Sequence, residues 1–189
     1  DWHEEFDYQF ATAQESRNTY NGRGDPNDFM GPALWPSSLS HFAEENQESG
    51  GLLGSHIDML HESPLGMGIA HDSENVYWYY DGHYGELVRY DFQEDHDTGE
   101  DDHSDGKVRR YSDIPLSRIP GVPGHMEMNH DNGILYIADT GAGRIIWVNT
   151  DGPGVTTNIM GDETQMEPLA EYSEVTGVEW GILDSGLSF

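Results

Sequence analysis

The chain has 189 residues, enough for one domain with a real core, and no cysteine, which excludes disulfide bonds and thiol chemistry. Its 36 Asp and Glu residues against 8 Lys and Arg residues give a formal net charge of −28. This charge repels nucleic-acid phosphates and anionic membrane surfaces, and it favours divalent cations or basic partners. We expect an extracellular or periplasmic location, although the missing cysteines give no clue to the redox compartment.

Residues 1–62 are the least regular part of the sequence, and we interpret them as an incomplete first repeat unit with a loop-rich connector. Predicted strands lie at 8–13, 17–20, 33–35 and 39–42. The intervening loop contains Arg23-Gly24-Asp25, the tripeptide that integrins recognise. An ordinary glycine turn in an acidic loop is the alternative, because three-residue motifs recur by accident.

The stretch 64–139 contains the same unit twice. Each copy begins with Pro, followed by Met, an apolar residue, His and Asp at the same spacing, in 64–72 and in 123–131. Each then enters an apolar, β-prone run that ends in Asp, at 76–81 and at 134–139, before a Gly turn and a third strand. An outer strand is expected after the second copy, near 175–183. Such a unit, repeated at tens of residues without a helical period, is typical of repetitive all-β folds and excludes βαβ winding.

These motifs resemble NHL repeats, the units of a family of β-propellers. The best match is the segment 137–145, with the sequence IADTGAGRI. The resemblance implies an all-β propeller segment of about three blades, divided as 1–62, 63–122 and 123–189, within a larger six-bladed ring. Because terminal blades leave strand edges and apolar faces uncovered, we expect the remaining blades to come from the same polypeptide or from a second protein chain.

An acidic insertion, residues 91–106, separates the third and fourth strands of the first complete unit. Oxygen ligands at alternating positions, with glycines between them, are what a Ca²⁺ loop requires, and the spacing of Asp95 and Asp97 matches the opening of an EF-hand loop. His96 and His103 lie among the acidic residues. A solvated, disordered loop is the alternative. The candidate calcium ligands are Asp91, Asp95, Asp97, Asp101, Asp102 and Asp105.

Two histidines, His71 and His130, occupy equivalent positions in the two copies, at the end of the first predicted strand. In propellers this strand lines the central channel, so the resemblance implies that both imidazoles approach one axis. There they could bind Zn²⁺ or another transition metal, with His61 or His125 as further ligands. A histidine that caps its own repeat turn is the alternative.

Two classes of function follow from these patterns. We favour a calcium-stabilised, NHL-like propeller that acts as a protein-binding or structural module without catalysis. The second class is a lyase or hydrolase, because the repeat pattern is also similar to that of the six-bladed peptidyl-hydroxyglycine lyases, which hold a channel Zn²⁺ with histidines. One zinc histidine of those lyases follows the Asp that ends the second strand, where this chain has Gly85 and Gly143, with His83 two residues early. This departure favours the binding function.

Overall fold

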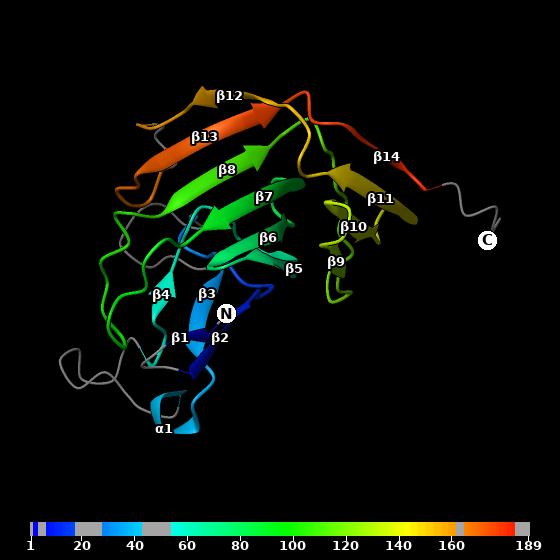
Figure 1. Cartoon of the computed structure of the whole chain (residues 1–189). Helices are drawn as coiled ribbons and strands as arrows, with labels where there is room; N and C mark the ends of the chain where they lie inside the picture. Colours follow the sequence, from blue (N-terminus) through cyan, green and yellow to red (C-terminus); the bar gives the residue numbers. More distant parts are fainter. Residues whose placement is uncertain (1, 4–6, 18–27, 43–53, 162–164, 184–189) are drawn as a thin grey trace.

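The computed structural model describes residues 2–3, 7–17, 28–42, 54–161 and 165–183 (Figure 1). Within these ranges the chain is almost entirely β, and no helix has the length and apolarity needed to cross a membrane. The elements are β1 (Trp2–His3), β2 (Asp7–Thr12), β3 (Ala33–Pro36), α1 (Leu39–Phe42), β4 (Asp58–Met59), β5 (Gly66–Ser73), β6 (Val76–Asp81), β7 (Glu86–Asp91), β8 (Lys107–Tyr111), β9 (Met126–Asn129), β10 (Ile134–Asp139), β11 (Arg144–Asn149), β12 (Val155–Asn158), β13 (Glu171–Thr176) and β14 (Trp180–Ile182).

These strands form three sheets, which confirms the predicted all-β class. The first sheet has the order β1-β2-β3-β4, the second β12-β13-β8-β7-β6-β5 and the third β14-β11-β10-β9. Neighbouring strands are antiparallel except for β13 and β8, which run parallel. The second and third sheets each contain one copy of the repeat, and they lie next to each other in space (Figure 1).

The two copies of the repeat build equivalent hairpins, β6 with β7 and β10 with β11. Both central strands end at a fully buried carboxylate, Asp81 in the first copy and Asp139 in the second. Asp81 Oδ2 lies 2.5 Å from Arg110 Nη2, and Asp139 Oδ2 lies 2.7 Å from Arg144 Nε. Each buried charge is therefore paired with a guanidinium, as a carboxylate removed from water requires.

The central strand β6 is buried on both faces. Trp78 and Tyr80 point to one side and pack in a cluster with Ile137 of β10. Tyr79 points to the other side and packs in a second cluster with Leu34 of β3. Because side chains alternate along a strand, one aromatic run can supply the core between the second and third sheets and the core beside the first sheet.

One face of the third sheet points away from the second sheet. Its residues are less buried than their equivalents in the first copy. Leu87 of β7 is fully buried, but its equivalent Ile145 of β11 is 45% exposed. Tyr136 and Trp147 pair across β10 and β11 on the same face as Ile145, and both are half-buried. Trp78, the equivalent of Tyr136, is 1% exposed. We call Tyr136, Ile145 and Trp147 the outer face.

One predicted strand is a helix instead. The segment 39–42 forms α1, because the Ser38 carbonyl accepts hydrogen bonds from the amides of His41 and Phe42. β3 ends at Pro36, and the Ser37 amide still donates to the Tyr8 carbonyl of β2 at 2.7 Å before the chain turns into α1.

Of two further strand predictions, one needs correction and the other lies partly outside the described residues. The outer strand predicted near 175–183 is divided, since β13 pairs with β8 and only β14 pairs with β11. The strand predicted at 17–20 does not include Arg17, which has no regular structure. The rest of that segment, and the Arg23-Gly24-Asp25 tripeptide, lie outside the described residues.

Candidate metal centre

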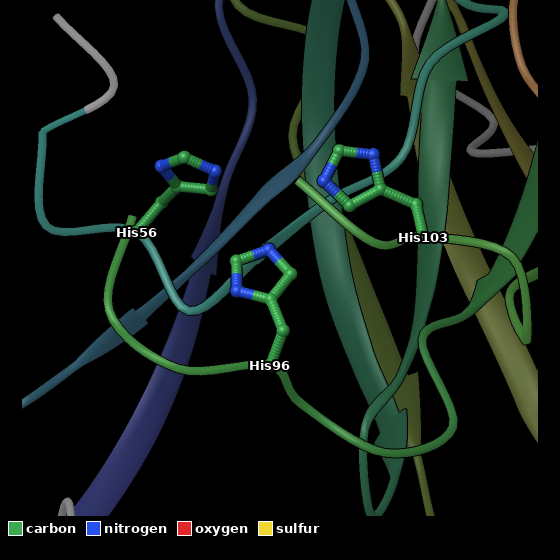
Figure 2. Close-up of side chains that lie close together, drawn as sticks. All are labelled: His56, His96 and His103. Atoms are coloured by element: carbon green, nitrogen blue, oxygen red, sulfur yellow. The ribbon is translucent and has the colours of Figure 1, made fainter. Parts of the chain in front are cut away.

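Three histidines from two separate segments lie side by side near β4 (Figure 2). His56 lies just before β4, whereas His96 and His103 belong to the acidic insertion between β7 and β8. Two backbone hydrogen bonds hold the insertion in place: the His96 amide donates to the Ile57 carbonyl at 2.9 Å, and the Gly99 amide donates to the His56 carbonyl at 2.7 Å. Gly99 has a φ of 72°, a conformation that glycine adopts without strain.

The hydrogen bonding of His96 determines which of its ring nitrogens can bind a metal. Nδ1 lies 2.7 Å from the carbonyl oxygen of Asp97, which can only accept, so Nδ1 carries the hydrogen. Nε2 is buried and has no hydrogen-bond partner. Burial lowers the pKa of His96 to about 4, so the ring is neutral near pH 7 and Nε2 presents a lone pair.

His103 is oriented in the same way by a carboxylate. Its Nδ1 lies 2.8 Å from Oε2 of Glu167, a residue in the connection between β12 and β13. A carboxylate accepts the hydrogen, so Nδ1 of His103 is the donor, and Nε2 presents a lone pair whenever the ring is neutral; this Nε2 too is buried without a partner. Each unsatisfied buried acceptor costs about 1–3 kcal/mol, which a bound cation would offset.

His56 completes the group. Its side chain is buried, and its ring centroid lies 5.2 Å from that of His96 and 6.5 Å from that of His103. One nitrogen from each of the three rings lies within 4.8 Å of the other two. Zinc requires a Zn–N distance of about 2.0–2.1 Å to each ring, so the three side chains would close in around a bound ion. We call these three residues the histidine triad.

A cavity of about 660 Å³ adjoins the histidine triad. His56 and His103 line it together with the apolar side chains of Trp35 and Met59 and the carboxylate of Glu100. A metal ion with three protein ligands keeps a fourth position for water or a substrate. The cavity provides the space next to that position.

His61, one of the four histidines predicted as channel ligands, lies in a second group beside the triad. Its Nε2 is 3.3 Å from Glu167 Oε2, and its ring centroid is 5.5 Å from that of His103. The ligand atoms of His61, His103 and Glu167 lie within 4.8 Å of one another. Burial lowers the pKa of His61, which keeps the ring neutral near pH 7.

The other predicted channel ligands are elsewhere. The rings of His71 and His130 do approach each other, with centroids 6.1 Å apart, as their equivalent repeat positions predict. His71 Nε2, however, lies 3.0 Å from the Glu74 carbonyl, and the pair has no third ligand among the residues that the structure describes. The side chain of His125 is 79% exposed. The structure therefore does not bring the four predicted histidines into one site.

The six predicted calcium ligands, all within the described part of the chain, form no group of three carboxylates close enough to share an ion. Instead, several bond locally. Asp102 Oδ1 accepts hydrogen bonds from the amide and hydroxyl of Ser104, and Asp105 Oδ2 accepts from the Glu94 amide. Calcium binding by the acidic insertion stays a prediction, and it would require the aspartates to move together.

In the sequence, His96 and His103 stand out only as neighbours of aspartates, and no pattern marks His56 or Glu167 as ligands. Two histidines in one insertion were a usable signal, because imidazoles favour transition metals whereas Ca²⁺ takes oxygen ligands. Comparisons of the chain with protein families, with curated proteins and with solved structures gave no match. The geometry of the histidine triad is therefore the basis for a functional proposal.

Proposed function

We propose that this chain is a metalloprotein whose histidine triad binds a divalent transition-metal ion such as Zn²⁺. The observation that carries the proposal is the pair of buried Nε2 atoms on His96 and His103, each without a partner and each oriented by a hydrogen bond at Nδ1. Neutral imidazoles suit Zn²⁺, Cu²⁺ and Ni²⁺, whereas Ca²⁺ is held by oxygen ligands. The donor set thus favours a transition metal in place of the calcium expected from the sequence.

The proposed role of this ion is structural. It would join His56, before β4, to two positions of the acidic insertion, and Glu167 would extend the connection to the segment between β12 and β13. Segments that only the folded state brings together gain stability from a shared ion, because the unfolded chain offers no preformed site. The ion would therefore anchor a long, highly charged connection to the sheets.

Zinc titration of the chelator-treated chain tests this role. We expect Zn²⁺ uptake and a higher melting temperature in the wild type, with both effects lost in His96→Ala. His130→Ala is the matched control, since His130 is exposed and lies outside both ligand groups. Uptake that is equal in the wild type and in His96→Ala would contradict the proposal.

We also propose that the three sheets are blades of an NHL-like propeller segment. The equivalent hairpins of the two copies support this arrangement, as does a hydrogen bond between the two repeat leads, from the Gly124 amide to the Met67 carbonyl at 2.8 Å. Tyr136 and Ile145 of the outer face occupy the positions of Trp78 and Leu87, which the first copy buries against its neighbour. It would bind a further sheet of the same repeat, from the same polypeptide or from a second chain.

An enzyme of the hydrolase or lyase type is the second candidate, and the cavity beside the triad favours it. A Zn²⁺ ion with an open position lowers the pKa of bound water to about 7. The residues of the chain would then hold the ion and shape the cavity wall, with Trp35 and Met59 as its apolar part. Zinc-dependent hydrolysis of an activated ester that disappears in His96→Ala would support catalysis, and equal rates would argue against it.

A further inference from the structure

Glu167 gathers a second set of ligand atoms next to the triad. Its Oε2 lies 3.3 Å from His61 Nε2 and 2.8 Å from His103 Nδ1. All three side chains are largely removed from solvent, with exposed fractions of 6% for His61, 9% for His103 and 11% for Glu167. One carboxylate oxygen and two imidazole nitrogens therefore converge inside the protein.

The orientation of His61 leaves a lone pair facing this carboxylate. Its Nδ1 is hydrogen-bonded to the carbonyl oxygen of Phe29, which can only accept, so Nδ1 carries the hydrogen. Nε2 of the neutral ring then has no hydrogen to donate to Glu167. The His61 amide donates to the other carboxylate oxygen, Oε1, at 3.0 Å and fixes the carboxylate in place. Two acceptors held this close in the interior repel each other, and a cation between them would remove this repulsion.

His103 belongs to both sets of ligands. Its Nδ1 faces Glu167 and His61, while its buried Nε2 is left for His56 and His96. The two nitrogens of an imidazole lie on different edges of the ring. As an imidazolate, the ring can therefore bind one metal ion at each nitrogen.

We propose that His61, Glu167 and His103 hold a second divalent transition-metal ion, bridged to the ion of the histidine triad by the His103 imidazolate. This inference rests on the proposed function, because the bridge needs an ion at the triad. In the bridging step the N–H bond at His103 Nδ1 breaks, a metal–Nδ1 bond forms, and the proton passes to the buffer. No electrons are transferred. Binding of the second ion thus releases one proton from His103.

Zinc stoichiometry and proton release test the second position. The full chain, stripped with a chelator, is titrated with Zn²⁺ alone, and calorimetry in two buffers of different ionisation enthalpy measures the protons released. We expect two zinc ions per chain in the wild type and one in His61→Gln and in Glu167→Gln, which also lose the proton release. His71→Gln is the control, since His71 is likewise bonded to a backbone carbonyl, and it should keep both ions.

Three other outcomes would overturn part or all of the proposal. One zinc ion in the wild type, kept by His61→Gln and lost in His96→Ala, overturns the second position and leaves the proposed function standing. Two ions without proton release overturn the imidazolate bridge. No bound zinc overturns the triad as well. Circular dichroism identifies any variant that fails to fold, and His61→Asn then replaces His61→Gln as the second variant.

Discussion

Nδ1 of His103 lies 2.8 Å from the Glu167 carboxylate, although the two residues are 64 positions apart in the chain. The contact joins the acidic insertion to the connection between β12 and β13. It leaves Nε2 of His103 as an acceptor for an ion shared with His56 and His96. Carboxylate–histidine pairs of this kind orient metal-binding imidazoles and raise their basicity.

Removing the charge of Glu167 should weaken zinc binding. We expect Glu167→Gln to lower the affinity for the first zinc ion about 10–100-fold, because an amide orients the His103 ring less firmly and does not raise its basicity. Competition with a chromogenic chelator measures the affinity. Glu127→Gln, at a side chain that is 76% exposed, is the control and should bind zinc like the wild type. An unchanged affinity in Glu167→Gln would show that the carboxylate does not support the triad.

Glu62 should make the metal-free protein less stable as pH rises. Burial raises the pKa of Glu62 from its usual 4.5 to about 8, and its Oε2 has no partner. Since the folded pKa exceeds the unfolded one, the unfolded chain releases this proton first, and the contribution of Glu62 to stability is lost as pH rises through about 8.

The variant Glu62→Gln cannot ionise and avoids this loss. We therefore expect the unfolding free energy of Glu62→Gln, relative to that of the wild type, to be a few kcal/mol higher at about pH 9 than at about pH 5. Denaturant titrations in the presence of a chelator measure the difference at both pH values. A difference between the two proteins that does not change with pH would refute this role of Glu62.

The outer face should drive association of the isolated chain. Each Å² of apolar surface removed from water stabilises an association by about 25 cal/mol. The outer face would bury Tyr136, Ile145 and Trp147 together. We expect self-association in salt that screens the charge of −28, and its loss in Ile145→Glu with Trp147→Glu. Light scattering measures the mass. A folded wild-type monomer with a cooperative melt in the same salt would count against a missing neighbouring sheet.

Calcium binding by the acidic insertion can be separated from zinc binding. If the aspartates bind Ca²⁺ as the sequence predicts, calorimetry will show uptake that Asp95→Asn with Asp97→Asn abolishes and that His96→Ala leaves intact. Zinc uptake should show the reverse dependence. No uptake at millimolar Ca²⁺, or uptake unaffected by the aspartate pair, would refute the calcium site.

Local pattern was enough to predict the main strands of the two repeat copies but not the metal centre. The run from Val76 to Asp81 alternates between two cores, so its β-propensity and its closing Asp identified β6 and, by repetition, β10. The triad depends instead on backbone hydrogen bonds between residues that are distant in sequence, such as Gly99 with His56. The parallel pairing of β13 with β8 is equally non-local, and no periodicity in either strand indicates it.

X-ray absorption at the zinc edge, on the full chain loaded with one equivalent of Zn²⁺, tests the histidine triad most directly. Binding at the triad predicts three imidazole nitrogens at about 2.0–2.1 Å in the wild type, and the loss of this bound zinc signal in His96→Ala. A shell of oxygen ligands alone, or a spectrum that His96→Ala leaves unchanged, would contradict it.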